Sequence, residues 1–266
     1  MYRVRRAVRL YRRSLGTHLR SVLEYEADFW LLIFAALLSQ GLGLAFIGAV
    51  FSRVPALNGW RFEEVVLVYA LSNLASGCGP LFFDGVWRLS WMLNKGELDY
   101  ALVRPFPVVL QVSSGMIGLH GIGDVIGAVA MLAWALSRLD VHWSPVTAAV
   151  GLVLVASGIA LKLAINLAAN SASFWLAGPH SLFAVAVHNV TGLAQYPVSI
   201  YGVGLRVLLS GVLPVAFVSF LPAAWLLDRG GYGWLGLLAP LVAAYCVGVS
   251  LFVFRRGLRR YESTGS

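Results

Sequence analysis

Long apolar stretches separated by short polar segments occupy most of the chain after residue 28. Each apolar stretch reaches about 20 residues, the length that an α-helix needs to cross the apolar core of a bilayer. The apolar positions are continuous rather than alternating, which disfavours a transmembrane β-barrel. The pattern therefore predicts an all-α membrane protein with six spanning helices, at about 29–51, 65–83, 108–136, 146–169, 205–227 and 234–254.

One further segment, 182–201, is fairly apolar but contains His188, Gln195 and Pro197. A seventh crossing here would place the arginines at 255–260 on the opposite side from the other basic segments. We therefore predict that 182–201 is an interfacial or bent connector on the cytosolic side. Prolines within 205–227 predict a kink or break in the fifth helix. Two arrangements follow from this: the helix crosses the membrane straight, or its outer end re-enters the membrane.

An amphipathic helix is predicted before the first span, at residues 3–23. At about 100° per residue, its valines and leucines fall on one stripe and its arginines on the other side. This pattern is typical of a helix that lies in the membrane interface, although a helix packed on a soluble partner would show it too. The arginines assigned to the interface are Arg5, Arg9, Arg12, Arg13 and Arg20.

Composition and charge support a membrane protein with a fixed orientation. The chain is 59% hydrophobic and only 12% charged, whereas soluble domains are about 25% charged. Its net charge is +8, and most basic residues fall in segments on one side of the predicted spans. Because cytosolic loops are enriched in lysine and arginine, both termini are expected in the cytosol and the protein in the cytoplasmic (inner) membrane. No groove-reading motif accompanies the charge, so a nucleic-acid partner is not expected.

The chain shows no motif for catalysis of its own. A nucleotide-binding P-loop places a lysine directly after a glycine, but the two lysines, Lys95 and Lys162, follow Asn94 and Leu161. The five histidines form none of the paired spacings of metal sites. We therefore expect a non-catalytic chain that binds no metal and no cofactor directly.

Two ionisable residues, Asp124 and Lys162, fall well inside predicted spans. Charge within hydrocarbon is unfavourable, so such residues usually face a partner or a wet cavity. Three interpretations stay open: a translocation path, a mutual ion pair, or structural contacts between neighbouring helices. Gly123 and Gly127 beside Asp124 favour close helix packing, within the subunit or between two subunits.

A polar loop between the second and third predicted spans, 84–107, is the most distinctive segment. Aromatic and apolar residues at 87–93 predict a short interfacial helix that ends at Gly96. Glu97 and Asp99 are then expected to present two carboxylates to the cytosol, where they would suit docking to a cationic surface; an ordinary solvated turn is the alternative. The predicted docking residues are Asn94, Lys95, Gly96, Glu97, Leu98 and Asp99.

The loop reads Lys95-Gly96-Glu97-Leu98-Asp99 and continues to Leu102-Val103-Arg104-Pro105. With a second stretch, Tyr196-Pro197-Val198-Ser199-Ile200-Tyr201, it resembles the membrane subunits of ABC transporters of the type 2 exporter class. The resemblance implies a single permease domain over 1–266, with an N-terminal interfacial helix at 1–28 and a coupling loop at 84–107. It also implies a separate ATPase subunit that carries ATP and Mg, a second permease of the same or a different chain, and contact with membrane lipids.

Three functions remain in competition at this stage. The leading one is a permease subunit of an ATP-driven exporter. The second is an autonomous secondary transporter or channel, in which Asp124 and Lys162 would couple transport. The third is a membrane scaffold that recruits partners through its arginine-rich helix. The sequence does not identify the substrate, nor does it distinguish a homodimer from a heterodimer.

Overall fold

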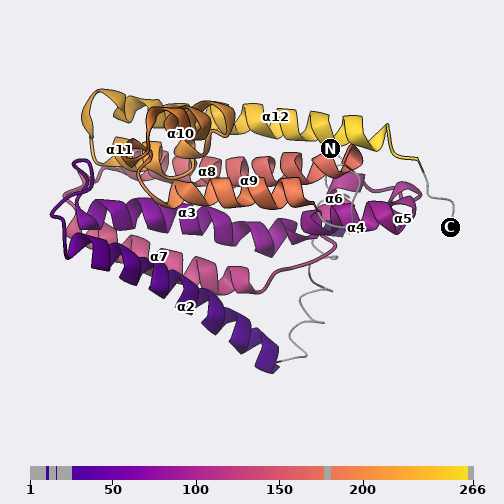
Figure 1. Ribbon diagram of the computed structural model, residues 1–266, viewed down its shortest axis with the longest axis horizontal. Helices are drawn as coiled ribbons and strands as arrows, with labels where there is room; N and C mark the ends of the chain where they lie inside the picture. Colours follow the sequence, from indigo (N-terminus) through magenta and orange to yellow (C-terminus); the bar gives the residue numbers. More distant parts are fainter. Residues whose placement is uncertain (1–9, 12–15, 17–25, 177–180, 263–266) are drawn as a thin grey trace.

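The computed structural model describes residues 10–11, 16, 26–176 and 181–262. Within these ranges the chain is helical and contains no β-sheet, and its long helices run side by side along the longest axis (Figure 1). The prediction of an all-α membrane protein is therefore confirmed. Arg5, Arg9, Arg12, Arg13 and Arg20 of the predicted interfacial helix lie outside the described residues.

Among the described residues, five helices are long and apolar enough to cross a membrane, and a sixth candidate is a bent pair of shorter helices. Local sequence sets some of their limits: the hydroxyl of Ser144 accepts a hydrogen bond from the Thr147 N–H (3.0 Å) and Pro145 occupies the first helical position. The five are α2 (Glu26–Phe51), α3 (Phe62–Phe83), α7 (His120–Arg138), α8 (Pro145–Ser171) and α12 (Ala239–Leu258), the last continued backwards by the 3₁₀ segment η7 (Gly230–Leu238).

Helix α3 lies at the centre of the bundle. All seven residues from Val65 to Leu71 are buried, so this helix is covered on every side. It packs against α7 and α8, while α2 covers α7 and α12 covers α8. The main hydrophobic core therefore forms around α3.

Short helices gather at one end of the bundle, at the right of Figure 1. We call this the α4 end. The hydroxyl of Tyr11 donates a hydrogen bond to the Phe82 carbonyl oxygen there. Its elements are η1 (Asp84–Arg88), α4 (Leu89–Asn94), α5 (Leu98–Leu102) and α6 (Val108–Ser113).

The third span starts later than the apolar pattern predicts. The predicted helix at 108–136 is broken, because α6 ends at Ser113 and α7 begins only at His120. Between them the Gly118 N–H donates a hydrogen bond to the Pro80 carbonyl oxygen of α3 (3.0 Å). This hydrogen bond holds the segment between α6 and α7 against α3.

The opposite end of the bundle holds the loop 52–61, the first turn of α3 and Arg229. We call this the Glu64 end. Helix α9 (Leu182–Gly192) and the turn η3 (Leu193–Gln195) run between the two ends. His188 lies against Trp87 of η1, with ring centroids 5.3 Å apart. Ser199, in η4 (Val198–Ile200), accepts a hydrogen bond from the Asn58 side chain at the Glu64 end (2.7 Å).

The prediction of a cytosolic-side connector at 182–201 is therefore wrong, because this segment crosses the bundle. Its polar residues are accommodated inside the protein: Gln195, for example, donates a hydrogen bond to Asn73 of α3 (3.4 Å). The helical stretch Leu182–Gln195 is about 21 Å long, so the residues that follow it, including η4, complete the crossing.

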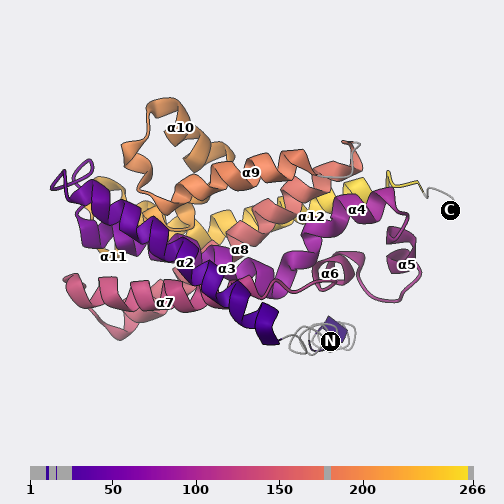
Figure 2. The same ribbon diagram turned by 60° about the horizontal axis from the view of Figure 1, so that its bottom comes forward.

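The segment predicted as the fifth span, 205–227, has the predicted break, and both of its ends lie at the same end of the bundle. It consists of two arms bent by 73°, with Pro214 at the break. Ser199 before it contacts Asn58, and Arg229 after it contacts Gly59, so both ends of the segment meet the same loop. The segment is re-entrant from the Glu64 end, and part of it, α10, projects beside α9 in Figure 2. Its elements are α10 (Val203–Val207), the π-helical turn η5 (Leu208–Val212), η6 (Val215–Phe217) and α11 (Phe220–Leu226).

Candidate functional site

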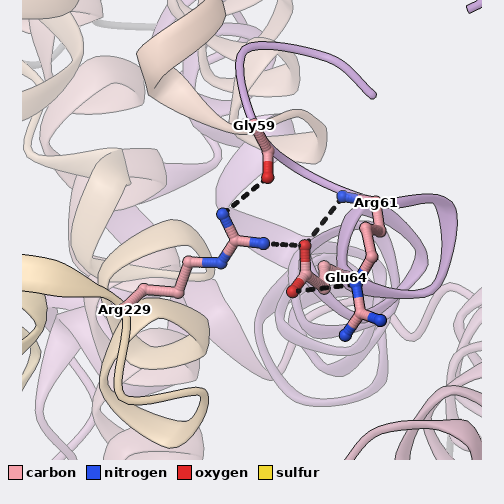
Figure 3. A network of polar contacts seen from close by, with 4 residues as sticks. All are labelled: Gly59, Arg61, Glu64 and Arg229. Carbon is pink, nitrogen blue, oxygen red and sulfur yellow. Dashed lines mark hydrogen bonds and ion pairs between the residues drawn. The ribbon is translucent and has the colours of Figure 1, made fainter. Parts of the chain in front are cut away.

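A buried ion network closes the Glu64 end (Figure 3). The Glu64 carboxylate is 5% exposed and pairs with the Arg229 guanidinium. The same carboxylate accepts a hydrogen bond from the Arg61 N–H (2.7 Å), and Arg229 also donates to the Gly59 carbonyl oxygen (2.6 Å). Arg229 thus connects the exit of the re-entrant segment to the loop before α3.

Aromatic rings complete this network. The Arg229 guanidinium lies 4.8 Å from the ring centroid of Trp60, which is only 1% exposed, in cation–π geometry. Trp60 in turn lies 5.3 Å from Phe220 of α11. This network is not predicted from the sequence, because Glu64 and Arg229 are 165 positions apart in the chain.

The polar loop 84–107 is firmly packed on the rest of the α4 end. Leu98 is fully buried and belongs to a second hydrophobic cluster that includes Leu167 of α8 and Phe254 of α12. Gly96 makes the turn between α4 and α5 at φ 70°, a conformation that glycine adopts without strain. Gly85 lies so close to the Val112 carbonyl oxygen of α6 that a side chain would not fit there.

The two carboxylates of this loop are partly exposed, and each has a partner within the chain. Glu97 forms an ion pair with Arg88 (3.8 Å), and Arg88 also covers the Trp91 ring. Asp99 faces Tyr261, which follows α12. Burial raises the pKa of the Tyr261 hydroxyl, and the hydrogen bond and negative charge of Asp99 raise it further.

Of the six predicted docking residues, only Asn94 and Lys95 are exposed; Gly96 and Leu98 are buried, and Glu97 and Asp99 are intermediate. Helix α5 and the residue that follows it contribute large exposed side chains that the prediction did not include: Tyr100 is 70% exposed and Val103 is 82% exposed. We call the exposed residues Asn94, Lys95, Tyr100, Leu102 and Val103, at the tip of the α4 end, the docking face.

Asp124 is placed between α2, α3 and α7 and has a structural partner. The Gln40 side chain donates hydrogen bonds to the Asp124 carboxylate (3.0 Å) and to its carbonyl oxygen (2.9 Å). A Cβ on Gly123 would lie 2.7 Å from the Ile33 carbonyl oxygen of α2. The small residues beside Asp124 therefore serve packing of α7 on α2 within one subunit.

Among the described residues Lys162 forms no ion pair with Asp124, which excludes one of the three interpretations that the sequence leaves open. Its ammonium group donates a hydrogen bond to the Thr191 hydroxyl of α9 (3.0 Å). It lines a cavity of about 280 Å³ near the α4 end, between α3, η1, α7, α8 and α9. The other polar residues that line this cavity are Ser76, Asp84, Trp87, His120, Asn166, His188 and Thr191.

Sequence analysis did not predict this gathering, because His120 and His188 show no metal-type spacing and come from different helices. Within the described ranges, no three histidine, cysteine or acidic side chains are grouped so as to hold a metal ion. The chemistry that the cavity offers is therefore charge and hydrogen bonding in an apolar surround.

A family model described as "ABC-2 family transporter protein" matches residues 37–265. The match covers almost the whole chain, including the polar loop, the cavity and the re-entrant segment. The chain belongs to the ABC-2 transporter family. Comparisons with curated proteins and with solved structures gave no match.

Membership of the ABC-2 family confirms the resemblance inferred from the polar loop and identifies the chain as a membrane permease of ABC transporter type. In an ABC-2 permease, the described arrangement separates three regions. The docking face lies at one end of the bundle, the cavity lies beside it, and the re-entrant segment lies at the other end.

Proposed function

We propose that this chain is the permease subunit of an ATP-driven ABC exporter and that a separate ATPase subunit binds its docking face. The observation that carries the proposal is the exposed apolar tip of α5, on a loop otherwise packed into the α4 end. Exposed apolar patches of this kind mark protein interaction sites. A second permease, of the same or a different chain, completes the translocation path.

Packing explains how docking would act on the membrane helices. The loop shares its hydrophobic cluster with Leu167 of α8 and Phe254 of α12, and η1 continues directly from α3. A displacement of α4 and α5 therefore reaches three spanning helices at once. ATP and Mg remain on the ATPase subunit, and the permease contributes the mechanical response.

The charge distribution supports a cytosolic α4 end and thereby cytosolic termini. The four arginines at the end of α12 extend the basic character of that end, which also holds Arg88, Lys95 and Arg104. At the Glu64 end, by contrast, Arg229 and Arg61 both pair with Glu64. Arg206 also lies at this end, where it donates a hydrogen bond to the Ser199 carbonyl oxygen (2.9 Å).

The test is affinity purification from the native host in mild detergent, comparing the wild type with Val103→Arg. We expect a stoichiometric ATPase with the wild type and at least tenfold less with Val103→Arg, because a charge replaces the most exposed apolar side chain of the docking face. His142→Arg is the matched control, since it adds the same charge to an exposed position at the opposite end. A wild-type chain that purifies without any ATPase would contradict the proposal.

An autonomous secondary transporter is the second candidate, and the observation that favours it is Lys162 in a cavity. That function requires transport by the chain alone in proteoliposomes. Transport that needs no ATPase and is abolished in Lys162→Gln would establish the second candidate in place of the first.

A further inference from the structure

The cavity beside Lys162 contains charged groups of both signs that do not touch one another. Lys162 of α8 lines it at Thr191 of α9, next to the His188 backbone, and Asp84 of η1 lines it near His120 of α7. In the part of the chain that the structure describes, no ion pair joins Lys162 to Asp84, so their charged atoms are more than 4.0 Å apart. The cavity therefore separates a cationic pole from an anionic pole.

The cationic pole is only partly satisfied by the protein. The Thr191 hydroxyl accepts the hydrogen bond from Lys162 and donates its own proton to the His188 carbonyl oxygen (2.8 Å). An ammonium group carries three donors, and Thr191 is the hydrogen-bond partner of Lys162 among the described residues. A charge in a membrane-spanning helix usually has a partner or lines a functional cavity. The remaining donors suit an anionic group of a ligand.

The anionic pole is held in place by close packing. Asp84 is 8% exposed. A Cβ on Gly118 would lie 2.8 Å from the Asp84 carboxylate and 2.7 Å from the His120 ring, so glycine at 118 leaves room for both side chains. Because the carboxylate faces the same cavity as Lys162, it can receive an ammonium group from a ligand whose anion binds Lys162.

Size and surroundings limit what the ligand can be. Pockets for drug-sized molecules are about 300–1,000 Å³, so a cavity of about 280 Å³ suits a small polar group rather than a whole large molecule. Val185, which lines the cavity on α9, is 45% exposed, and Leu182 and Phe183 on the same helix are 78% and 50% exposed. The cavity therefore opens at the side of the bundle next to an apolar surface.

We propose that this cavity binds the headgroup of a zwitterionic amphiphile, with its anionic group at Lys162 and its ammonium group at Asp84. The apolar chains of the ligand lie along the exposed face of α9. That the bound molecule is also the transported one rests on the permease function proposed above. The binding itself needs neither an ATPase nor transport, so a negative result for headgroup binding would leave the permease function untouched, and the reverse also holds.

The test is calorimetric binding to the purified full-length chain, with three probes. Dihexanoyl-phosphatidylethanolamine carries both charges, dihexanoyl-phosphatidylmethanol keeps the phosphodiester but lacks the amine, and free phosphoethanolamine lacks the chains. Lys162→Gln should weaken both lipid probes by about tenfold or more, as the loss of a charged hydrogen bond predicts. Asp84→Asn should weaken only the probe with the amine. Arg53→Gln, which removes an exposed charge at the Glu64 end, should leave the affinity for all three probes unchanged.

Lys162→Arg keeps the charge and should retain binding, which separates a lost ligand contact from a folding defect. Unchanged binding in Lys162→Gln would overturn the site. Equal affinity of the wild type for both lipids, unaltered by Asp84→Asn, would overturn the zwitterionic assignment. Free phosphoethanolamine binding as tightly as the lipid would overturn the amphiphile and point to a soluble zwitterion.

Discussion

Glu64 shows how a single side chain at one helix terminus can organise a distant part of the fold. Its carboxylate is buried, yet it contacts Arg229, the backbone of Arg61 and, through Arg229, the carbonyl oxygen of Gly59. Removal of one member of a buried ion pair leaves an uncompensated charge and is strongly destabilising, by about 3–5 kcal/mol. The pair therefore contributes to stability mainly through the penalty of breaking it.

We expect Glu64→Gln to lower the free energy of unfolding by about 3 kcal/mol, because Arg229 would remain partly buried without its counter-ion. Thermal unfolding of the purified protein in detergent measures the effect. Arg53→Gln, an exposed charge in the same loop, is the control and should be neutral. Equal stability of the two variants would show that the ion pair does not hold the Glu64 end.

A second residue-scale prediction concerns Tyr261. Asp99→Asn should lower the pKa of its hydroxyl, because a nearby negative charge disfavours the phenolate. The pKa should stay above its ordinary value, since burial remains. Fluorine NMR of 3-fluorotyrosine at position 261, titrated to alkaline pH, follows the group directly. Glu97→Gln should leave the titration unchanged, and an equal shift in both variants would argue against a specific Asp99 contact.

At the scale of elements, continuous apolar runs predicted α2, α3, α8 and α12 well, since their sequences leave few alternatives to a spanning helix. The path of α9 along the bundle was not predicted, because a hydropathy pattern does not account for the partners that polar side chains find inside a bundle. His188 lies against Trp87 and Gln195 reaches Asn73, so polar groups that argue against a lipid-facing span are tolerated within a bundle. The break before α7 depends on a hydrogen bond to α3, which no local pattern reports.

The packing of α7 on α2 gives an element-scale prediction. We expect Gly123→Ala to destabilise the protein by about 1–3 kcal/mol, as overpacking typically does, because the new Cβ would lie 2.7 Å from a backbone oxygen of α2. Gly41→Ala is the matched control: it lies on α2 with nothing within 4 Å of its Cβ position. It should be neutral or slightly stabilising. Unfolding midpoints measured in the same detergent compare the two variants.

At the scale of the whole molecule, the sequence predicted the all-α membrane class and the transporter family. It did not predict the cavity, because Asp84, His120, Lys162 and His188 come from four elements. The sequence pattern also assigned the crossing to 205–227 rather than to 182–201, since 205–227 is the more apolar segment. The structure attaches both ends of 205–227 to the loop 52–61. These are contacts between residues distant in the chain, which hydropathy does not report.

This arrangement predicts a labelling pattern in intact cells. In a background without Cys78 and Cys246, single cysteines at Gly202 and Gly231 should both react with a membrane-impermeant maleimide from outside. Both positions have open space around them, and both flank the re-entrant segment. A cysteine at Lys95 should react only after the cells are opened. Labelling of Gly202→Cys and Gly231→Cys from opposite sides would mean that 205–227 crosses the membrane.

The ion pair between Glu64 and Arg229 also has a consequence in time. The two residues are 165 positions apart in the chain, and ribosomes add about 5–20 residues per second. During synthesis, Glu64 therefore waits roughly 8–33 s for Arg229. Throughout that interval Glu64 has Arg61 beside it but not Arg229, and the Glu64 end closes only when the segment that carries Arg229 has been made.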